Sequence, residues 1–416
     1  MRAAAFGVWR QLGLDIVLVD GHSQGRYEDL ATEFHALDAR DESADRERLR
    51  RIALGCDGIT TLTDDGQRIA AQLAEDVGLP GVGAQAGAAA RSKALQRRLC
   101  ERAGIGVPRW REITSVEDLD DFYAAGPVPA VLKPLDSAGG AGAMLVETRS
   151  EAARHWPIVR SLSPTKAGIL EEFLPGREVC VDAIVQGGEI LFVSSVDCEH
   201  MRTVGFLCTS SSYATENPDV APATAMLRAV VDALDVRDGI VHAEYKIDGG
   251  DWTTVEVGLR PGGALVPELT VKVSGVDLYE AQALIALGDR PGQPVPAQAP
   301  YAQGRYLVGE GQVRSFVPPA EVLADLPDVK VVSQQLGAGQ HARMPLSEAG
   351  RAGFAYGWGS DRLDLDTQLR VAVDRLGQRM GLTVRGNDPA DPLSSATGPG
   401  PWWQPVALEE SCSSAP

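Results

Sequence analysis

A segment that alternates apolar and charged side chains constrains this chain more than any other. Between Gly239 and Arg260 the alternation runs on both sides of a pair of glycines. A period of two is that of a β-strand, so the segment is predicted to form a β-hairpin with one apolar and one charged face. The apolar face is predicted to comprise Val241, Ala243, Tyr245, Ile247, Val255, Val257 and Leu259.

Two carboxylates on the charged face predict a cation site. If Gly249–Asp251 form a three-residue turn, Glu244 lies directly opposite Glu256, whereas a two-residue turn would put them on opposite faces. Like charges directly opposite each other destabilise a strand pair. A bound cation would relieve this repulsion, and hard oxygen ligands suit Mg²⁺. A solvated strand face explains the same two residues about equally well.

The composition narrows the class of protein and its partners. The chain has 416 residues, enough for two or three domains, and a net charge of −18. That charge argues against nucleic acid and anionic membranes as partners and leaves small molecules. Six cysteines without a C-x-x-C pair indicate reduced thiols and a cytoplasmic protein. There is no signal-peptide layout and no apolar run long enough to span a membrane. A homodimer is compatible with the sequence.

The order of helical and strand patterns divides the chain into five parts. Residues 1–90 alternate the two patterns, which predicts a doubly wound, Rossmann-like α/β domain. Their first pattern is helical, so we expect a first strand to be missing from the numbered chain. Residues 91–178, 179–299 and 300–385 are predicted to be α+β units. Residues 386–416 are rich in Pro, Gly and Ser and are predicted to be disordered.

A glycine-rich stretch follows a predicted strand that ends at Lys133. Backbone N–H groups of such a loop can wrap phosphate oxygens, and the lysine adds a positive charge. The G-K-[ST] ending of a Walker A loop is absent, and glycine loops are more often simple turns. The candidate phosphate-binding residues of the loop are Ser137, Gly139, Gly140 and Gly142.

A second stretch has the pattern of a strand that ends in a hinge. It comprises Glu171, Glu172, Phe173 and Leu174, followed by Pro-Gly. Backbone groups of a hinge can hydrogen-bond an adenine ring, and Glu178 could accept both ribose hydroxyls. An ordinary turn with surface acids is about as well supported by these residues alone.

Taken in order, these stretches resemble the ATP-grasp superfamily over about residues 91–290. The likeness is strongest to carboxylate–amine ligases of the bacilysin-synthetase type, which join amino acids. It implies an ATP-grasp fold, in which two α+β lobes grip ATP, preceded by the doubly wound domain. The residues that carry the resemblance are Lys93 in Arg91-Ser-Lys93, Lys133, the glycine loop, the hinge, Glu178, Glu244, Glu256 and Arg260.

The resemblance also implies roles for these residues. Lys93, Lys133 and the glycine loop would contact the phosphates of ATP, Glu171 and Leu174 would offer hinge groups to adenine, and Glu178 would hold the ribose. Glu244 and Glu256 would carry one or two Mg²⁺ ions, or Mn²⁺. Many members carry Asn two residues after the second carboxylate, where this chain has Gly258. That departure weakens the case for a second ion.

The implied reaction is ATP-dependent formation of an amide bond, peptide or γ-glutamyl in type, between amino acids. A carboxylate is phosphorylated to an acyl-phosphate, an amine attacks it, and ADP and phosphate are released. Arg260 would steady the acyl-phosphate under a lid of roughly residues 112–178. His200, in a loop predicted at 197–221, could accept the amine's proton, although a solvated loop histidine is favoured. A biotin-carboxylase-like enzyme that activates bicarbonate is the nearest alternative.

Two short motifs match other enzyme classes. Gly21-His-Ser23-Gln-Gly25 fits the nucleophile elbow of serine hydrolases, but it lies too near the N-terminus for the strands that should precede it. His242-Ala-Glu244 fits the H-x-E motif of zinc deaminases, but no P-C-x-x-C follows. Serine hydrolysis therefore stays a distant alternative, and that zinc site is not supported.

Overall fold

A computed structural model describes residues 3–21, 27–37, 42–201, 206–345 and 347–387. Ser23 of the hydrolase-like motif and the tail predicted to be disordered, from 388 onward, lie outside the described residues. Within the described ranges, no helix has both the length and the apolar character needed to cross a membrane.

A ten-stranded sheet forms the centre of the described fold, with eight strands in the order β11-β10-β7-β8-β9-β12-β15-β13. Neighbours along this path are antiparallel, and β14 and β16 pair with β12 outside it. The strands are β7 (Arg177–Gln186), β8 (Glu189–His200), β9 (Cys208–Ala214), β10 (Gly239–Asp248), β11 (Asp251–Gly258), β12 (Tyr301–Gln312), β13 (Val329–Gln334), β14 (His341–Ala342), β15 (Gly353–Gly359) and β16 (Thr383–Arg385).

Helices bury the apolar residues of this sheet. One core cluster joins apolar residues of β7 and β10 to α8, and a second joins β12 and β15 to α12. The C-terminal unit thus continues the central sheet, because β12 pairs with β9 along five residues. The helices beside the sheet are α8 (Val220–Leu234), α9 (Val266–Ser274), α10 (Leu278–Ala286), α11 (Pro319–Leu323) and α12 (Arg362–Met380), with a 3₁₀ turn η2 (Glu348–Gly350).

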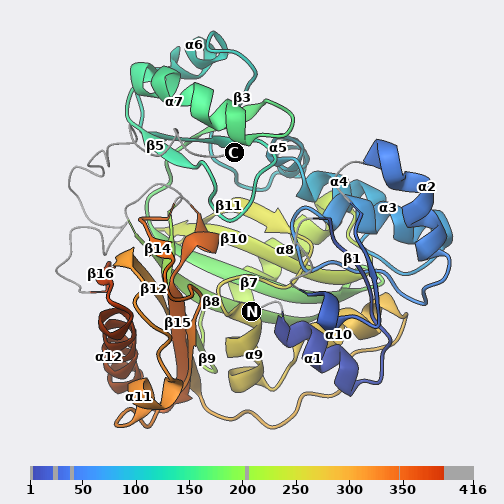
Figure 1. Ribbon diagram of the computed structural model, residues 1–416. Coiled ribbons are helices and arrows are strands. Elements are labelled where there is room, and N and C mark those ends of the chain that lie inside the picture. Colours follow the sequence, from blue (N-terminus) through green and yellow to red (C-terminus); the bar gives the residue numbers. More distant parts are fainter. Residues whose placement is uncertain (1–2, 22–26, 38–41, 202–205, 346, 388–416) are drawn as a thin grey trace.

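A separate four-stranded sheet, with the order β3-β6-β4-β5, lies above the hairpin at the top of Figure 1. Apolar residues of its strands pack with those of α6 and α7 into a core of their own. This sheet and its helices form the small lobe, whose role as a lid stays a prediction. Its elements are β3 (Trp110–Ile113), α6 (Asp118–Tyr123), β4 (Ala130–Pro134), β5 (Met144–Val146), α7 (Arg149–Leu162) and β6 (Gly168–Glu172).

The N-terminal unit is mainly helical in its described part. Two short strands pair in parallel, and the other described residues up to 90 form no strand. The doubly wound sheet therefore remains a prediction, as do the predicted domain limits. The elements are α1 (Ala3–Gln11), β1 (Val17–Val19), η1 (Glu28–Leu30), β2 (Glu33–His35), α2 (Glu42–Ala53), α3 (Gln67–Val77) and α4 (Ala84–Ala90), followed by α5 (Lys93–Arg102).

The hairpin β10–β11 places its two carboxylates opposite each other, as predicted, but by a different device. Asp248 pairs with Asp251, so the turn holds two residues, Gly249 and Gly250, and the predicted three-residue turn is wrong. A β-bulge beside Glu244 shifts the register, and Glu244 then faces Glu256. Such a bulge sets two residues of one strand against one of the other.

The bulge also changes one residue of the predicted apolar face. Val241, Ala243, Tyr245, Val257 and Leu259 are buried as expected. Val255 is the extra residue of the bulge and lines a cavity, so its placement in the apolar face is wrong. Thr254 pairs with Tyr245 instead and is buried.

The prediction of a long polar loop at 197–221 is also largely wrong. Residues up to His200 complete β8, and Cys208–Ala214 form β9, which pairs with β8 and β12. Serines and threonines are typical of loops in a sequence, yet Thr209, Ser210 and Ser211 are buried in the sheet. Their hydroxyls find partners there, as in the bond from Gln303 Nε2 to Ser210 Oγ.

We expect the hairpin turn to depend on glycine. Gly249 and Gly250 have φ of +58° and +99°, and an added Cβ would meet nothing within 4 Å at either. Alanine should therefore destabilise the fold by about 1–2 kcal/mol at each position through backbone strain alone. Gly7, in α1, also has open space around it but no positive φ. Gly7→Ala should stabilise by roughly 0.5–1 kcal/mol. Urea unfolding measures the change in the free energy of unfolding for all three variants. A change of the same sign in all three would contradict the role assigned to positive φ.

Candidate active site

One cavity lies where the small lobe, the hairpin and strands β7–β9 meet. It is lined by nearly all the site residues that the sequence predicted. Gly142 is the exception among them: its φ is +74°, and an added Cβ would meet Leu162 and Pro134 instead. The predicted residues that line the cavity are Lys93, Lys133, Ser137, Gly139, Gly140, Glu171, Glu172, Phe173, Leu174, Glu178, His200, Glu244, Glu256 and Arg260.

A buried ion cluster beside the cavity joins three elements, α5, β4 and β6. Glu171 on β6 accepts from Arg97 Nε at 2.6 Å through one oxygen and lies 2.6 Å from Lys133 Nζ through the other. Arg97, on α5, is fully buried and also donates to the carbonyl of Val255 in the bulge. Burial raises the pKa of Glu171, but Arg97 and Lys133 outweigh it and hold that pKa at about 2.

Two backbone N–H groups of the hinge already donate within the protein, which leaves fewer of them for an adenine ring. Glu172 N–H donates to Arg109 O and Phe173 N–H to Pro129 O. Glu171 lies in β6 between β3 and β4, and its side chain belongs to the buried ion cluster. Of the two predicted adenine contacts, Leu174 is the one that lies beyond the strand, at the edge of the cavity.

Glu178 lies at the start of β7, between two cationic or ionisable side chains. Lys246 Nζ on β10 is 3.1 Å from one carboxylate oxygen, and His200 Nε2 on β8 is 3.3 Å from the other. Burial raises the pKa of Glu178, but the charges of His200 and Lys246 outweigh burial. The pKa is therefore lowered, and the carboxylate stays ionised. His200 is therefore a partner of Glu178 and ends a strand, whereas the sequence suggested a solvated loop.

The charged face of the hairpin concentrates negative charge. The pKa of Glu244 is raised, first by burial and then by the nearby Glu178 and Glu256, with His242 acting in the opposite direction. Glu256 is balanced by Lys93 Nζ at 3.0 Å, which also donates to Ser137 O at 2.7 Å. A divalent cation between Glu244 and Glu256 would relieve this repulsion, so the residues present fit Mg²⁺.

A histidine beside this pair is held in a fixed orientation. His242 Nδ1 lies 2.5 Å from Asp182, whose carboxylate also accepts from Gly262 N–H, and His242 Nε2 lies 3.5 Å from Glu244. Burial lowers the pKa of His242, but Asp182 and Glu244 outweigh it and raise that pKa to about 10. His242 therefore contributes a positive charge to the acidic floor of the cavity.

Arg260 is anchored by the N-terminal unit. Its Nε and one terminal nitrogen each donate to a different oxygen of Asp64 at 2.8 Å, and the other terminal nitrogen donates to Pro261 O. Two planar, parallel bonds of this kind fix a guanidinium in place. Burial raises the pKa of Asp64, but Arg260 outweighs it and the pKa is lowered.

Sequence reasoning missed several residues that organise this site. Asp64, Arg97 and Asp182 come from segments without a motif, and their partners lie 60 to 196 positions away. Lys246 also belongs to this group, since its ammonium group pairs with Glu178. The sequence did contain a cue for Arg97. It follows Lys93 by about one helical turn and therefore shares the same face of the helix.

Family models match two parts of the chain that contribute residues to this cavity. Residues 7–81 match the ATP-grasp N-terminal domain. Residues 91–204 match the ATP-grasp (A) domain of phosphoribosylglycinamide synthetase. The second match includes Lys93, Lys133, the glycine loop, the hinge and Glu178.

Curated relatives are similar over part of their length. Human carnosine synthase 1 is 28% identical over 337 residues, which are 73% of this chain and 40% of that protein. Dapdiamide A synthase from Enterobacter agglomerans is 25% identical over 45% of this chain and 46% of its own length. This chain thus spans less than half the length of either relative.

Solved structures share the fold. L-amino acid ligase from Bacillus licheniformis superimposes with a TM-score of 0.75 at 20% identity, covering 92% of this chain and 95% of its own. N5-carboxyaminoimidazole ribonucleotide synthetase from Thermus thermophilus gives 0.69 at 22% identity, covering 90% and 95%. The predicted ATP-grasp fold is confirmed.

We expect the Glu171 cluster to stabilise the fold in a pH-dependent way. A carboxylate whose folded pKa is near 2 contributes stability above its unfolded pKa of about 4.3, and loses it as the pH falls toward 2. Glu171→Gln should therefore cost about 3 kcal/mol in the free energy of unfolding between pH 5 and 8. That cost should shrink steadily below pH 4. Urea unfolding across this range measures it, and a cost independent of pH would refute the assignment.

Proposed function

The chain belongs to the ATP-grasp superfamily, and we propose that it is an ATP- and Mg²⁺-dependent ligase that joins a carboxylate to an amine. Both substrates would be small molecules of the amino-acid class, and the product an amide. The reaction would proceed through an acyl-phosphate and release ADP and phosphate. The carnosine and dapdiamide synthases among its relatives support this class of reaction.

The observation that carries the proposal is the convergence of basic and acidic side chains in one cavity. Lys93 and Lys133 come from separate elements, and both ammonium groups face it beside the glycine loop. Glu244, Glu256 and Arg260 line the same cavity, and Glu256 lies 3.0 Å from Lys93 Nζ. Against a net charge of −18, such a local set of cations suits a polyphosphate held through a divalent ion.

Each group of residues has a role in this proposal. Leu174 would meet adenine at the hinge, and Glu178, kept ionised by Lys246 and His200, would accept the ribose hydroxyls. Lys93, Lys133 and the loop Ser137–Gly140 would bind the phosphates. Mg²⁺, held by Glu244 and Glu256, would neutralise charge on the phosphates when bound.

Arg260 would position the acyl-phosphate and the tetrahedral centre that follows. Its orientation is set before substrate arrives, because Asp64 holds it from the N-terminal unit. A preorganised donor of this kind stabilises developing negative charge without rearranging. The small lobe would exclude water from the acyl-phosphate. His200 would act through Glu178 in the nucleotide site, and its predicted role as the acceptor of the amine's proton remains a proposal.

The setting of the protein is also proposed. The five cysteines in the described residues are free thiols, which supports a cytoplasmic location. The strongly acidic composition supports small-molecule partners and disfavours nucleic acid. The homodimer remains a prediction that light scattering tests.

Activation of bicarbonate is the alternative within the same fold. Structural neighbours include a biotin carboxylase from Campylobacter jejuni, at a TM-score of 0.64 and 16% identity. At that identity the likeness supports the fold alone. Only the substrate distinguishes the two reactions.

We expect amino acids, and not bicarbonate, to stimulate ATP turnover. Phosphate release is measured with ATP and Mg²⁺ across a grid of amino-acid pairs and with bicarbonate, and mass spectrometry identifies the products. At least one pair should release phosphate and yield a condensed product with the loss of one water. Stimulation by bicarbonate alone would overturn the ligase assignment in favour of the alternative.

Loss of a metal carboxylate should abolish the first half of the reaction. Glu256→Ala should lower ADP formation by roughly 100-fold or more, because a charged group that acts on the transferring phosphoryl group is lost. Glu112→Ala is the matched control: Glu112 also pairs with a basic side chain, Arg98, at 3.3 Å, but away from the cavity. The control should retain wild-type turnover, and thermal unfolding checks both folds. Wild-type turnover in Glu256→Ala would remove the metal assignment.

A further inference from the structure

Three cysteines on the floor of the cavity have no role in the proposed reaction. Cys180 on β7, Cys198 on β8 and Cys208 on β9 are all buried and all line the cavity. The sulfur atoms of Cys180 and Cys198 lie 3.0 Å apart. Thiols at this depth, beside a hard-cation site, introduce donors that Mg²⁺ does not favour.

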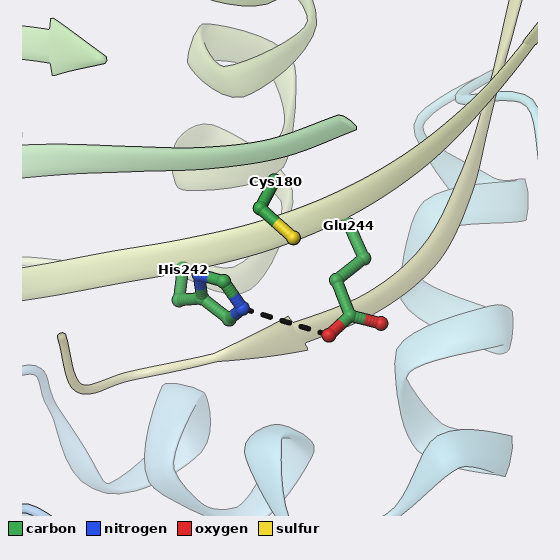
Figure 2. A group of neighbouring side chains, drawn as sticks. All are labelled: Cys180, His242 and Glu244. Carbon is green, nitrogen blue, oxygen red and sulfur yellow. Dashed lines mark ion pairs between the residues drawn. The ribbon is translucent and has the colours of Figure 1, made fainter. Parts of the chain in front are cut away.

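One of these thiols lies within reach of two other metal-binding side chains. The sulfur of Cys180, a ring nitrogen of His242 and a carboxylate oxygen of Glu244 all lie within 4.8 Å of one another. Figure 2 shows the three side chains converging from β7 and β10, with the contact from His242 to Glu244 dashed. Cysteine, histidine and glutamate are the ligand types of Zn²⁺.

The nitrogen–oxygen edge of this group is close to what a tetrahedral ion requires. Zn–N and Zn–O bonds of about 2.0–2.1 Å give a nitrogen–oxygen edge of roughly 3.4 Å. His242 Nε2 and Glu244 Oε1 are already 3.5 Å apart. The Cys180–Cys198 sulfur separation of 3.0 Å is shorter than the edge of about 3.8 Å that two Zn–S bonds would give. We therefore assign a ligand role to Cys180 and not to Cys198.

The orientation of His242 is a second, independent observation. Asp182 is fully buried, lies 2.5 Å from His242 Nδ1 and also accepts from Gly262 N–H. A carboxylate that binds one ring nitrogen presents the other to a metal, as in carboxylate–histidine–zinc triads. Here the nitrogen presented is Nε2, which faces Glu244 and Cys180.

We propose that Cys180, His242 and Glu244 form a Zn²⁺ site, with its fourth position open to the cavity. On binding, the Cys180 thiol loses its proton to solvent as the Zn–S bond forms, and Nε2 of His242 gives up its proton likewise. Sulfur and nitrogen donors select Zn²⁺ over Mg²⁺. Because Glu244 is also a proposed Mg²⁺ ligand, Zn²⁺ at this site excludes Mg²⁺ and inhibits ATP turnover.

Co²⁺ is the probe that reports a thiolate ligand directly. The full chain, reduced and free of metal, is titrated with Co²⁺ without nucleotide, and absorption spectra are recorded. The wild type should develop a thiolate-to-Co²⁺ charge-transfer band, which added Zn²⁺ removes. Cys180→Ser should abolish the band. Cys56→Ser should keep it, because Cys56 lies in the N-terminal unit, away from the cavity.

Calorimetric titration with Zn²⁺ extends the test to affinity. Cys180→Ser and His242→Ala should each weaken Zn²⁺ binding at least tenfold, whereas Cys56→Ser should leave it unchanged. Thermal unfolding confirms that each variant folds. Absence of the charge-transfer band in the wild type, or its survival in Cys180→Ser, would overturn the proposal. Neither measurement requires turnover. A negative result would therefore overturn the Zn²⁺ site and leave the proposed ligase activity untouched.

Discussion

A single buried guanidinium connects the parts of this molecule that must act together. Arg97 extends from α5 and has no exposed surface. Its guanidinium binds Glu171 of the small lobe and donates to the carbonyl of Val255 in the hairpin bulge. Glu171 in turn holds Lys133. Removal of one member of such a buried network leaves an uncompensated charge, which costs far more than a surface pair. The lysine proposed to meet phosphate and strand β11, which carries the proposed metal ligand Glu256, are therefore positioned by one common interaction.

The hairpin shows both what the sequence determines and where it falls short. The alternation correctly separates the buried Val241, Ala243 and Tyr245 from the charged Glu244. The register depends on one extra residue, and periodicity alone does not locate a bulge. The sequence did contain a cue for the turn. Two-residue turns are the commonest in hairpins, and they favour pairs such as Gly-Gly because both residues need a positive φ, as Gly249 and Gly250 have here. With that turn, opposed carboxylates require a shift of one residue before Glu256.

Other parts of the site could not have been predicted from one sequence. Motifs predicted the ATP-grasp fold and many of the residues that line the cavity, because those residues cluster in short segments. Contacts across the chain leave no such local trace. Asp64 meets Arg260 across 196 positions, and β9 was hidden by serines whose hydroxyls are satisfied inside the sheet. Burial of polar residues is decided by partners that only the fold brings close.

The N-terminal unit also affects how many cations the hairpin can hold. An added Cβ at Gly258 would lie 3.7 Å from both Asp64 Oδ1 and Gln67 Nε2. Gln67 accepts from Leu259 N–H and donates to Asp64, and Asp64 is committed to Arg260. A side chain at position 258 would thus contact Asp64 and Gln67, the residues that fix Arg260. Gly258 itself offers no side-chain ligand beside Glu256, which supports the proposal of one Mg²⁺ between Glu244 and Glu256.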